Sequence, residues 1–157
     1  MKTLNKDATK NSAVVKGLTT LLADTYALLG QTQVAHWNVE GPAFFSLHIA
    51  FENQYNELFP AVDEIAERLR ALDELSPGGL QTLAALSSIS ELPIEHMPAK
   101  DLVAHLIECN EIVVATSMEL RKASEEAGDL ETQDMVIARI QVHAKALWML
   151  RSFLKNL

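Results

Sequence analysis

The chain is poor in cysteine and lacks long hydrophobic runs. Its 157 residues contain one cysteine, Cys109, so no intrachain disulfide can form and one chain cannot build a thiolate metal cluster. No segment approaches the roughly 20 apolar residues of a membrane span, and the N-terminus lacks the apolar core of a signal peptide. These absences predict a cytoplasmic protein that is neither secreted nor embedded in a membrane.

Strand-like alternation and internal repeats are also absent, whereas apolar residues recur at three- and four-residue spacing. The spacing predicts four long helices, over about 14–36, 43–72, 99–127 and 131–156. Asn11 and Ser12 are candidate caps for the first of them. Three of the five prolines and a Gly-Gly pair lie in 73–98, which predicts a connection with one short helical turn around LQTLAAL.

The lengths of the connections indicate the topology. Tight turns after the first and third helices make antiparallel hairpins, whereas the long segment between the second and third helices can run the length of the molecule. The predicted fold class is therefore all-α, a ferritin-like four-helix bundle with a long crossover that carries a short helix. We expect the bundle to comprise residues 13–157 and to follow a flexible basic tail of residues 1–12.

Charge is distributed unevenly along the chain. In the first sixteen residues, four lysines against Asp7 give +3, which leaves −11 for the rest of a chain whose formal charge is −8. An acidic body attracts cations and repels nucleic-acid phosphate. The composition therefore favours metal ions over DNA as partners, unless the tail dominates.

The stretch HWNVEGPAFFSLH, residues 36–48, has a histidine at each end and a Gly-Pro turn between them. The turn ends one predicted helix and opens the next, so it places His36 beside His48. Glu52 follows one helical turn after His48, on the same face. Imidazole and carboxylate ligands suit Fe(II), with Zn(II), Mn(II) and Co(II) as competitors. For His36 taken alone, a hydrogen-bonded core histidine is the stronger alternative.

Asp63 and Glu67 form a second pair on the same face of the second helix. His48 and Asp63 are fifteen residues apart, about 22 Å along a helix axis, so one chain cannot bring both pairs to one ion. Two such helices packed antiparallel across a two-fold axis would create two equivalent sites, each completed by both subunits. A solvated acidic face is the alternative.

Two further features bear on this intersubunit hypothesis. The sequence has no Glu-x-x-His motif, which argues against a di-iron site inside one chain. Large apolar residues lie near the acidic positions and are expected to form the dimer interface: Leu47, Phe51, Tyr55, Leu58 and Phe59.

The block HWNVEGPAFFSLHIAFENQYNELFPAVDEIAER resembles the signature of Dps proteins, the small ferritin-like proteins from starved cells. The segments SPGGLQTLAALSSI and GDLETQDMVIARIQVHAKALWMLRSFL resemble the crossover and last helix of that family, so the resemblance covers nearly the whole chain after residue 12. It implies a dodecameric cage with ferroxidase centres at its two-fold interfaces. Such a cage oxidises Fe(II), preferably with hydrogen peroxide, stores ferric mineral and protects the cell from oxidative damage.

By position, the resemblance implies that His36 and His48 come from one subunit, and Asp63 and Glu67 from its partner. Glu52 stands where the family usually has aspartate, which puts the occupancy of the second iron position in question. In the same way Trp37 matches a tryptophan near the centre that could intercept a stray oxidising equivalent. An aromatic residue that fills the core is the alternative for Trp37.

Asp129 and Asp134 match acidic positions that line three-fold pores in the family. Asp129 could instead serve the start of the last helix, where negative charge is favourable. Pro60 falls inside the second helix and should bend it. Ala144 replaces a frequent glutamate, which removes a possible ion pair near His143.

Two other functions compete with an iron-oxidising cage. The first is a DNA-compacting structural protein that uses the lysine-bearing tail, with salt-sensitive binding at best. The second is an inert bundle whose histidines are packing residues. His96 and His105 are interpreted as structural or solvent-facing.

Overall fold

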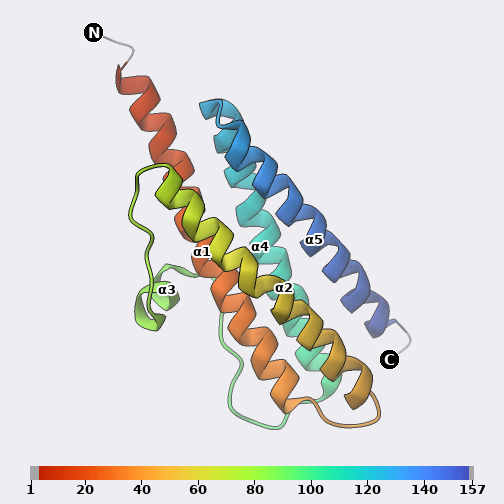
Figure 1. The fold of residues 1–157 in the computed structure, drawn as a ribbon. Helices are drawn as coiled ribbons and strands as arrows, with labels where there is room; N and C mark the ends of the chain where they lie inside the picture. Colours follow the sequence, from red (N-terminus) through yellow and green to blue (C-terminus); the bar gives the residue numbers. More distant parts are fainter. Residues whose placement is uncertain (1–3, 156–157) are drawn as a thin grey trace.

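The computed structural model describes residues 4–155, which form five helices and no strand (Figure 1). The helices are α1 (Leu4–Asn38), α2 (Phe44–Ala71), α3 (Leu80–Leu86), α4 (Ala99–Ala127) and α5 (Leu130–Leu154). Four long helices and a short one in the crossover confirm the predicted all-α, ferritin-like bundle. None of the described helices is long and apolar enough to cross a membrane.

The start of α1 differs from the prediction. The helix begins at Leu4, not at the candidate caps Asn11 and Ser12. Residues 4–13 contain neither proline nor glycine and include several good helix formers, so the helix continues past these caps. Flexibility of a tail over residues 1–12 stays a prediction, and residues 1–3 lie outside the described residues.

The chain path follows the predicted topology. α1 packs against α2, α4 packs against α5, and α1 also packs against α4 and α3. Figure 1 shows the crossover leaving the upper end of α2 and returning to the lower end, where α4 begins, so that α2 and α4 run parallel. Pro60 does not interrupt α2, which is helical from Phe44 to Ala71.

The core is built from apolar side chains of the long helices, including Leu18, Leu21, Phe51, Ile65 and Leu106, which are fully buried. Burying each such side chain contributes about 1.5–3 kcal/mol. α1 and α4 approach closely at Gly17, where an added Cβ would lie 2.8 Å from Cδ1 of Leu120. A larger residue at position 17 would force the Leu120 side chain to move.

A buried carboxylate attaches the crossover to the bundle. Oδ1 of Asp24 accepts hydrogen bonds from the Ser87 hydroxyl (2.9 Å) and the Ser88 N–H (2.8 Å). Its Oδ2 accepts one from the Thr116 hydroxyl (2.9 Å). Asp24 is fully buried, and in the described part of the chain it has no ion-pair partner. These three hydrogen bonds therefore compensate for the desolvation of the carboxylate and fix the segment after α3.

Candidate metal centre

The turn between α1 and α2 brings the two histidines of the signature stretch into contact. Gly41 adopts a φ of 98°, a conformation that favours glycine, and its carbonyl accepts a hydrogen bond from the Phe44 N–H at 3.0 Å. α1 therefore ends two residues after His36, and α2 begins four residues before His48. The predicted juxtaposition of the two imidazoles is present in the structure.

Each imidazole binds the backbone of the other histidine. Nδ1 of His36 lies 2.8 Å from the carbonyl oxygen of His48, and Nδ1 of His48 lies 2.8 Å from the carbonyl oxygen of His36. Because a carbonyl oxygen only accepts, both Nδ1 atoms must carry the proton and donate it. In the neutral rings, both Nε2 atoms then keep a lone pair. Metal-binding histidines are commonly oriented by such a bond from the other ring nitrogen.

Aromatic rings surround the histidine pair. The two imidazoles stack with centroids 3.7 Å apart and planes at 17°. Phe44 stacks on His48 at 4.9 Å, and Tyr55 meets His36 edge-on at 5.2 Å. His36 is only 7% exposed, which agrees with the alternative that it is a hydrogen-bonded core histidine. Its hydrogen bond, however, uses Nδ1, and neither Nε2 has a hydrogen-bond partner among the described residues.

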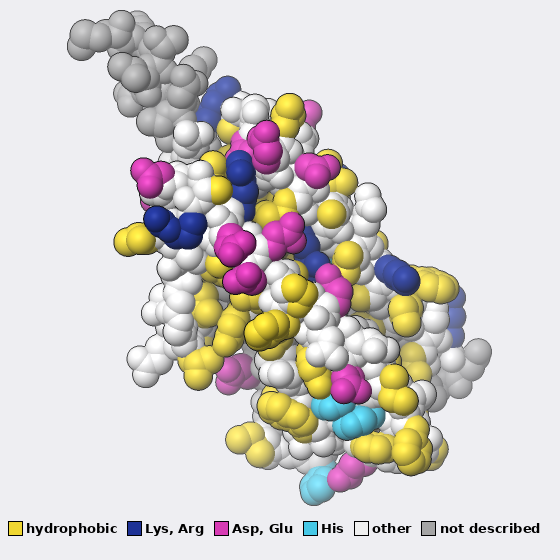
Figure 2. Space-filling model, in the orientation of Figure 1, with side chains coloured by type: hydrophobic (Ala, Val, Ile, Leu, Met, Phe, Trp, Pro, Cys, Tyr) yellow, Lys and Arg dark blue, Asp and Glu magenta, His cyan; other side chains and the backbone are white. Residues whose placement is uncertain are grey.

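The predicted carboxylates lie on the outward face of α2. The side chains are exposed, in agreement with the prediction that they share one face of the helix: Glu52, Asp63 and Glu67. Figure 2 shows acidic and hydrophobic side chains mixed over α2, with histidine side chains at the surface towards its lower end. The large apolar residues that are exposed on α2 are Phe45 (78%), Ile49 and Phe59 (73%).

The prediction that five large apolar residues lie on this face is wrong for three of them. Leu47, Phe51 and Leu58 are buried in the chain's own core, and Tyr55 is half-buried. Only Phe59 of the predicted set is exposed on the outward face. At 100° per residue, the three buried residues lie on the side of α2 that is turned towards the bundle. Phe45 and Ile49, which the sequence argument omitted, share the carboxylate face instead.

One chain supplies the ligand candidates in two separate groups. His36, His48 and Glu52 lie near the start of α2, whereas Asp63 and Glu67 lie near its end. In the described part of one chain, no three His, Cys, Asp or Glu side chains are close enough together to hold a metal ion. The structure of one chain therefore brings the two histidines together but not the complete predicted ligand set.

Trp37 does not fill the core, so that alternative is wrong for the single chain. Its side chain is 65% exposed and lines a surface hollow together with Glu40, Glu91 and His96. Nδ1 of His96 lies 3.5 Å from a carboxylate oxygen of Glu40, and both side chains are exposed. The solvent-facing interpretation of His96 agrees with this position.

His105 is half-buried and contacts polar groups of the chain, which agrees with its interpretation as a structural residue. Its Nε2 lies 3.2 Å from Oε1 of Gln31, which also accepts the Leu92 N–H at 2.7 Å. Burial lowers the pKa of His105, with a smaller opposing effect of Glu108. Sγ of Cys109 lies 3.4 Å from the same Nε2, and burial raises the pKa of this thiol to about 12. Cys109 is therefore a protonated, unreactive thiol at neutral pH.

Asp129 has a role within the chain. Its side chain accepts the Thr132 N–H at 3.0 Å, which caps α5, and also pairs with NH2 of Arg68 at 2.7 Å. Burial alone would raise the pKa of the Asp129 carboxyl, but the Thr132 hydrogen bonds and the Arg68 guanidinium bring it below its usual value. These contacts agree with the alternative in which Asp129 serves the start of the last helix. Asp134 is exposed, and the pore remains a prediction for both aspartates.

A polar network that the sequence did not predict links α2, α4 and α5. Arg139 binds the carboxylate of Glu57 with both terminal nitrogens, and its NH2 lies 3.0 Å from Nε2 of His143. Nδ1 of His143 lies 2.9 Å from Oδ1 of Asn110. Because Arg139 can only donate, Nε2 accepts and Nδ1 donates, which defines a neutral imidazole. Burial, together with Arg139, lowers the pKa of His143 to about 3.

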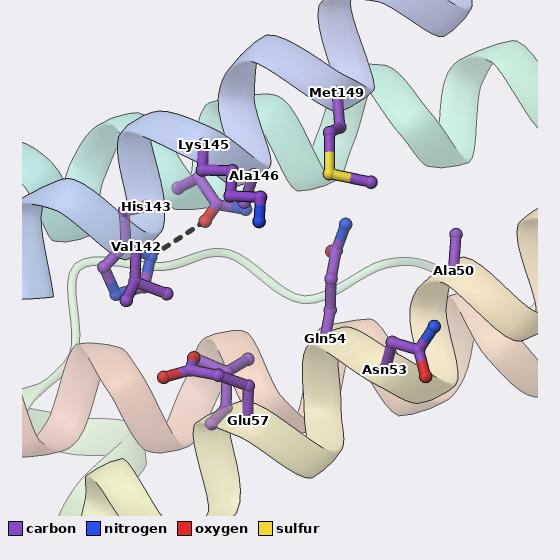
Figure 3. Close-up of a pocket in the computed structure, with 11 residues that line it drawn as sticks. Ala50, Asn53, Gln54, Glu57, Val142, His143, Lys145, Ala146 and Met149 are labelled. Atoms are coloured by element: carbon purple, nitrogen blue, oxygen red, sulfur yellow. Dashed lines mark hydrogen bonds between the residues drawn. The ribbon is translucent and has the colours of Figure 1, made fainter.

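This network lies beside a groove of about 320 Å³ between α2 and α5 (Figure 3). In Figure 3, Gln54 and Glu57 extend from α2 towards Val142, His143 and Met149 of α5. Ala144, expected to cost an ion pair near His143, is exposed, and the ion pair here is Glu57–Arg139. In the sequence, the only sign of this polar network is that His143 falls on the apolar stripe of the last helix.

Comparisons with known proteins agree with the fold. Residues 15–157 match the ferritin-like domain family. DNA protection during starvation protein 2 of Bacillus anthracis is 30% identical over 146 residues, which cover 93% of this chain and 99% of that protein.

Comparison with solved structures also finds Dps proteins with the same fold. Dps from Thermosynechococcus elongatus has a TM-score of 0.92 and 26% identity, over 96% of this chain and 95% of that chain. A Dps protein from Vibrio cholerae, described as a member of a superfamily of ferritin-like diiron-carboxylate proteins, has a TM-score of 0.89 and 26% identity, over 94% and 92%. The chain therefore belongs to the ferritin-like domain family and, within it, to the Dps proteins.

Proposed function

We propose that this protein is a ferroxidase that oxidises Fe(II), stores the ferric product inside a cage and thereby limits oxidative damage. The observation that carries the proposal is the reciprocal bonding of His36 and His48. It leaves two Nε2 lone pairs on imidazoles in contact, with the Glu52 carboxylate one helical turn away. Membership of the Dps family supports iron as the metal.

A second copy of the chain would complete the site. α2 carries Asp63 and Glu67 on its outward face at the end opposite His48. Antiparallel packing of two α2 helices across a two-fold axis would place these carboxylates opposite the partner's histidines. Phe45 and Phe59 are large apolar residues exposed on that face, and burial between copies would remove them from water.

The ligand set suits oxidation of iron as a substrate. Carboxylates stabilise Fe(III) more than Fe(II), so Glu52, Asp63 and Glu67 favour the loss of an electron at the site. Two Fe(II) ions supply the two electrons that reduce one hydrogen peroxide, which takes up two protons and becomes two waters, so no hydroxyl radical is released. The two neutral imidazoles would hold the iron, and the exposed Trp37 would intercept a stray oxidising equivalent. A net charge of −8 favours the approach of cations.

The first experiment tests the metal centre. The intact protein and its His36→Ala/His48→Ala variant are titrated with Fe(II) without oxygen, then mixed with hydrogen peroxide, and Fe(III) formation is followed by absorbance. We expect the double variant to oxidise iron at least about tenfold more slowly than the parent. His96→Ala, which removes an exposed histidine outside the site, is the control and should match the parent. Equal rates for the parent and the double variant would exclude this centre.

A complementation experiment tests whether two subunits form the site. His36→Ala/His48→Ala lacks one half of the ligands, and Asp63→Ala/Glu67→Ala lacks the other. Refolded together in equal amounts, half of the dimers would be mixed, and each mixed dimer would contain one intact site of two. About a quarter of the parent's activity should therefore return. A mixture as inactive as its components would contradict a site shared between two subunits.

DNA compaction is the alternative function, and it rests on the +3 charge of the first sixteen residues. Several copies of this tail in one assembly would add weak contacts with phosphate. DNA compaction ranks below iron oxidation because the remainder of the chain is acidic and repels phosphate. DNA retention in a low-salt gel shift, lost when residues 1–11 are removed, would reverse this ranking.

A further inference from the structure

The aromatic surroundings of the histidine pair do more than fill space. Phe44, His48 and His36 form a continuous stack of three rings, with planes inclined by 24° and 17° at the two contacts. Tyr55 closes the other side of His36 with its ring nearly perpendicular, at 83°. The two imidazoles are thus held between a phenyl face and a phenol ring.

The hydrogen bonds alone do not fix the two rings. Each imidazole makes one bond, at Nδ1, and rotation about the bond between Cβ and the ring is a broad, shallow torsion. An imidazole held at one atom can still tilt and carry its Nε2 away from a bound ion. Flat contacts on both faces of the His48 ring prevent that tilt. A metal site tolerates only about 0.5 Å of displacement of its ligands.

We propose that Phe44 is a positioning residue for the metal centre, acting through His48. The inference rests on the proposed function, since it assigns a role in the same site. Phe44 is the first residue of α2, one residue beyond the N-cap Ala43, so the element that places His48 also supplies its supporting ring. The neighbouring Phe45 is 78% exposed and contacts Phe44 edge-on, without contact to either imidazole ring.

Tyr55 contributes its ring and not its hydroxyl. In the described residues, that hydroxyl has no hydrogen-bond partner, whereas the ring edge touches His36. Replacement by phenylalanine should therefore leave the histidine pair in place. The two aromatic neighbours thus differ in what a conservative substitution removes.

The test measures Co(II) binding without oxygen, followed by the visible absorption of the bound ion. The parent is compared with Phe44→Leu, Phe44→Tyr and Tyr55→Phe. Loss of a residue that orients a metal ligand typically weakens binding by about 10–100-fold. We expect Phe44→Leu to raise the Co(II) dissociation constant by about tenfold or more and to alter the spectrum. The other two variants should stay close to the parent, because each keeps the stacked ring.

The outcomes separate this inference from the proposed function. If the parent binds no Co(II), or if His36→Ala/His48→Ala binds it equally well, the proposed function fails. If that double variant loses Co(II) while Phe44→Leu binds it with the parent's affinity and spectrum, only the role of Phe44 is wrong. Thermal unfolding identifies folded variants, and Phe44→Met gives a second non-aromatic side chain if leucine prevents folding. Weak binding by Phe44→Tyr would also count against a stacking role.

Discussion

His36 and His48 each donate from Nδ1 to the other's carbonyl oxygen at 2.8 Å, across the turn that joins α1 to α2. Each bond uses the side chain of one residue and the backbone of the other. His36→Ala therefore leaves the His48 bond in place but removes one of two stacked rings. The pair is a single structural unit in which each member can be tested separately.

The first prediction concerns how the two histidines combine. If both imidazoles bind the same ion, either single alanine variant should lose most of the metal affinity. The double variant should then bind the ion about as weakly as the single variant with the lower affinity, since the effects of two substitutions within one site are not additive. Co(II) titration of the parent, both single variants and the double variant measures this. Binding losses that simply add would mean that the imidazoles serve separate ions.

The second prediction concerns Glu52, which is exposed one turn after His48. It is one methylene longer than the aspartate that the resemblance to Dps proteins implies at this position. The extra methylene moves the carboxylate by about 1 Å, which is enough to weaken one metal position while Glu52 remains a ligand. We expect Glu52→Asp to tighten the weaker of two Fe(II) binding steps by about tenfold. Glu64→Asp makes the same change at an exposed α2 position outside the ligand set and should have no effect. Anaerobic Fe(II) titration measures both steps, and an unchanged weaker step in Glu52→Asp contradicts the prediction.

The helices and the histidine turn could be predicted because their signals are local. Apolar spacing, Gly41-Pro42 and the proline-rich segment 73–98 each act within a few residues of chain. The helix start at Leu4 was missed because capping preferences at Asn11 and Ser12 are weak against the helix propensity of the residues before them. Caps alone therefore do not locate the start of a helix.

Contacts between distant segments could not be predicted in this way. The network of Glu57, Arg139, His143 and Asn110 joins three helices, and no sequence pattern pairs these residues. The reciprocal bonds of the histidine pair likewise depend on ring orientations that spacing does not define. For the site, the sequence could thus supply candidate ligands and the helix faces on which they lie, but not the tautomers or the supporting rings.

The third prediction concerns the buried Asp24. Asp24→Asn keeps the shape of the side chain but removes its charge and replaces one acceptor oxygen with an NH2 group. At the Oδ1 position this group would face the Ser88 N–H, and at the Oδ2 position the Thr116 hydroxyl would have to turn from donor to acceptor. We expect the free energy of unfolding to fall by about 1–3 kcal/mol. Asp73→Asn is the matched control, because Asp73 is exposed and asparagine tolerates its positive φ. Urea unfolding at a fixed protein concentration compares the variants, and equal stabilities would show that the carboxylate does not anchor the crossover.

The fourth prediction concerns stability in acid and the buried His143. Burial and the neighbouring Arg139 lower the pKa of His143 to about 3 in the folded chain, against an ordinary value of 6.5. Between these two values the unfolded chain takes up a proton that the folded chain does not. The free energy of unfolding should therefore fall as the pH falls from about 6.5 towards 3, by up to about 1.4 kcal/mol per pH unit from this group. Above about pH 6.5 this contribution is constant.

His143→Gln tests this prediction because glutamine cannot take up the proton. Urea unfolding at pH 4, 5, 6 and 7 should show a smaller loss of stability with acid in the variant, so its difference from the parent narrows as the pH falls. His96→Gln removes an exposed imidazole and should keep the parent's slope. If His143→Gln also keeps that slope, then His143 takes up a proton in the folded chain. The contact from Arg139 to Nε2 could not then persist, because both groups would be donors.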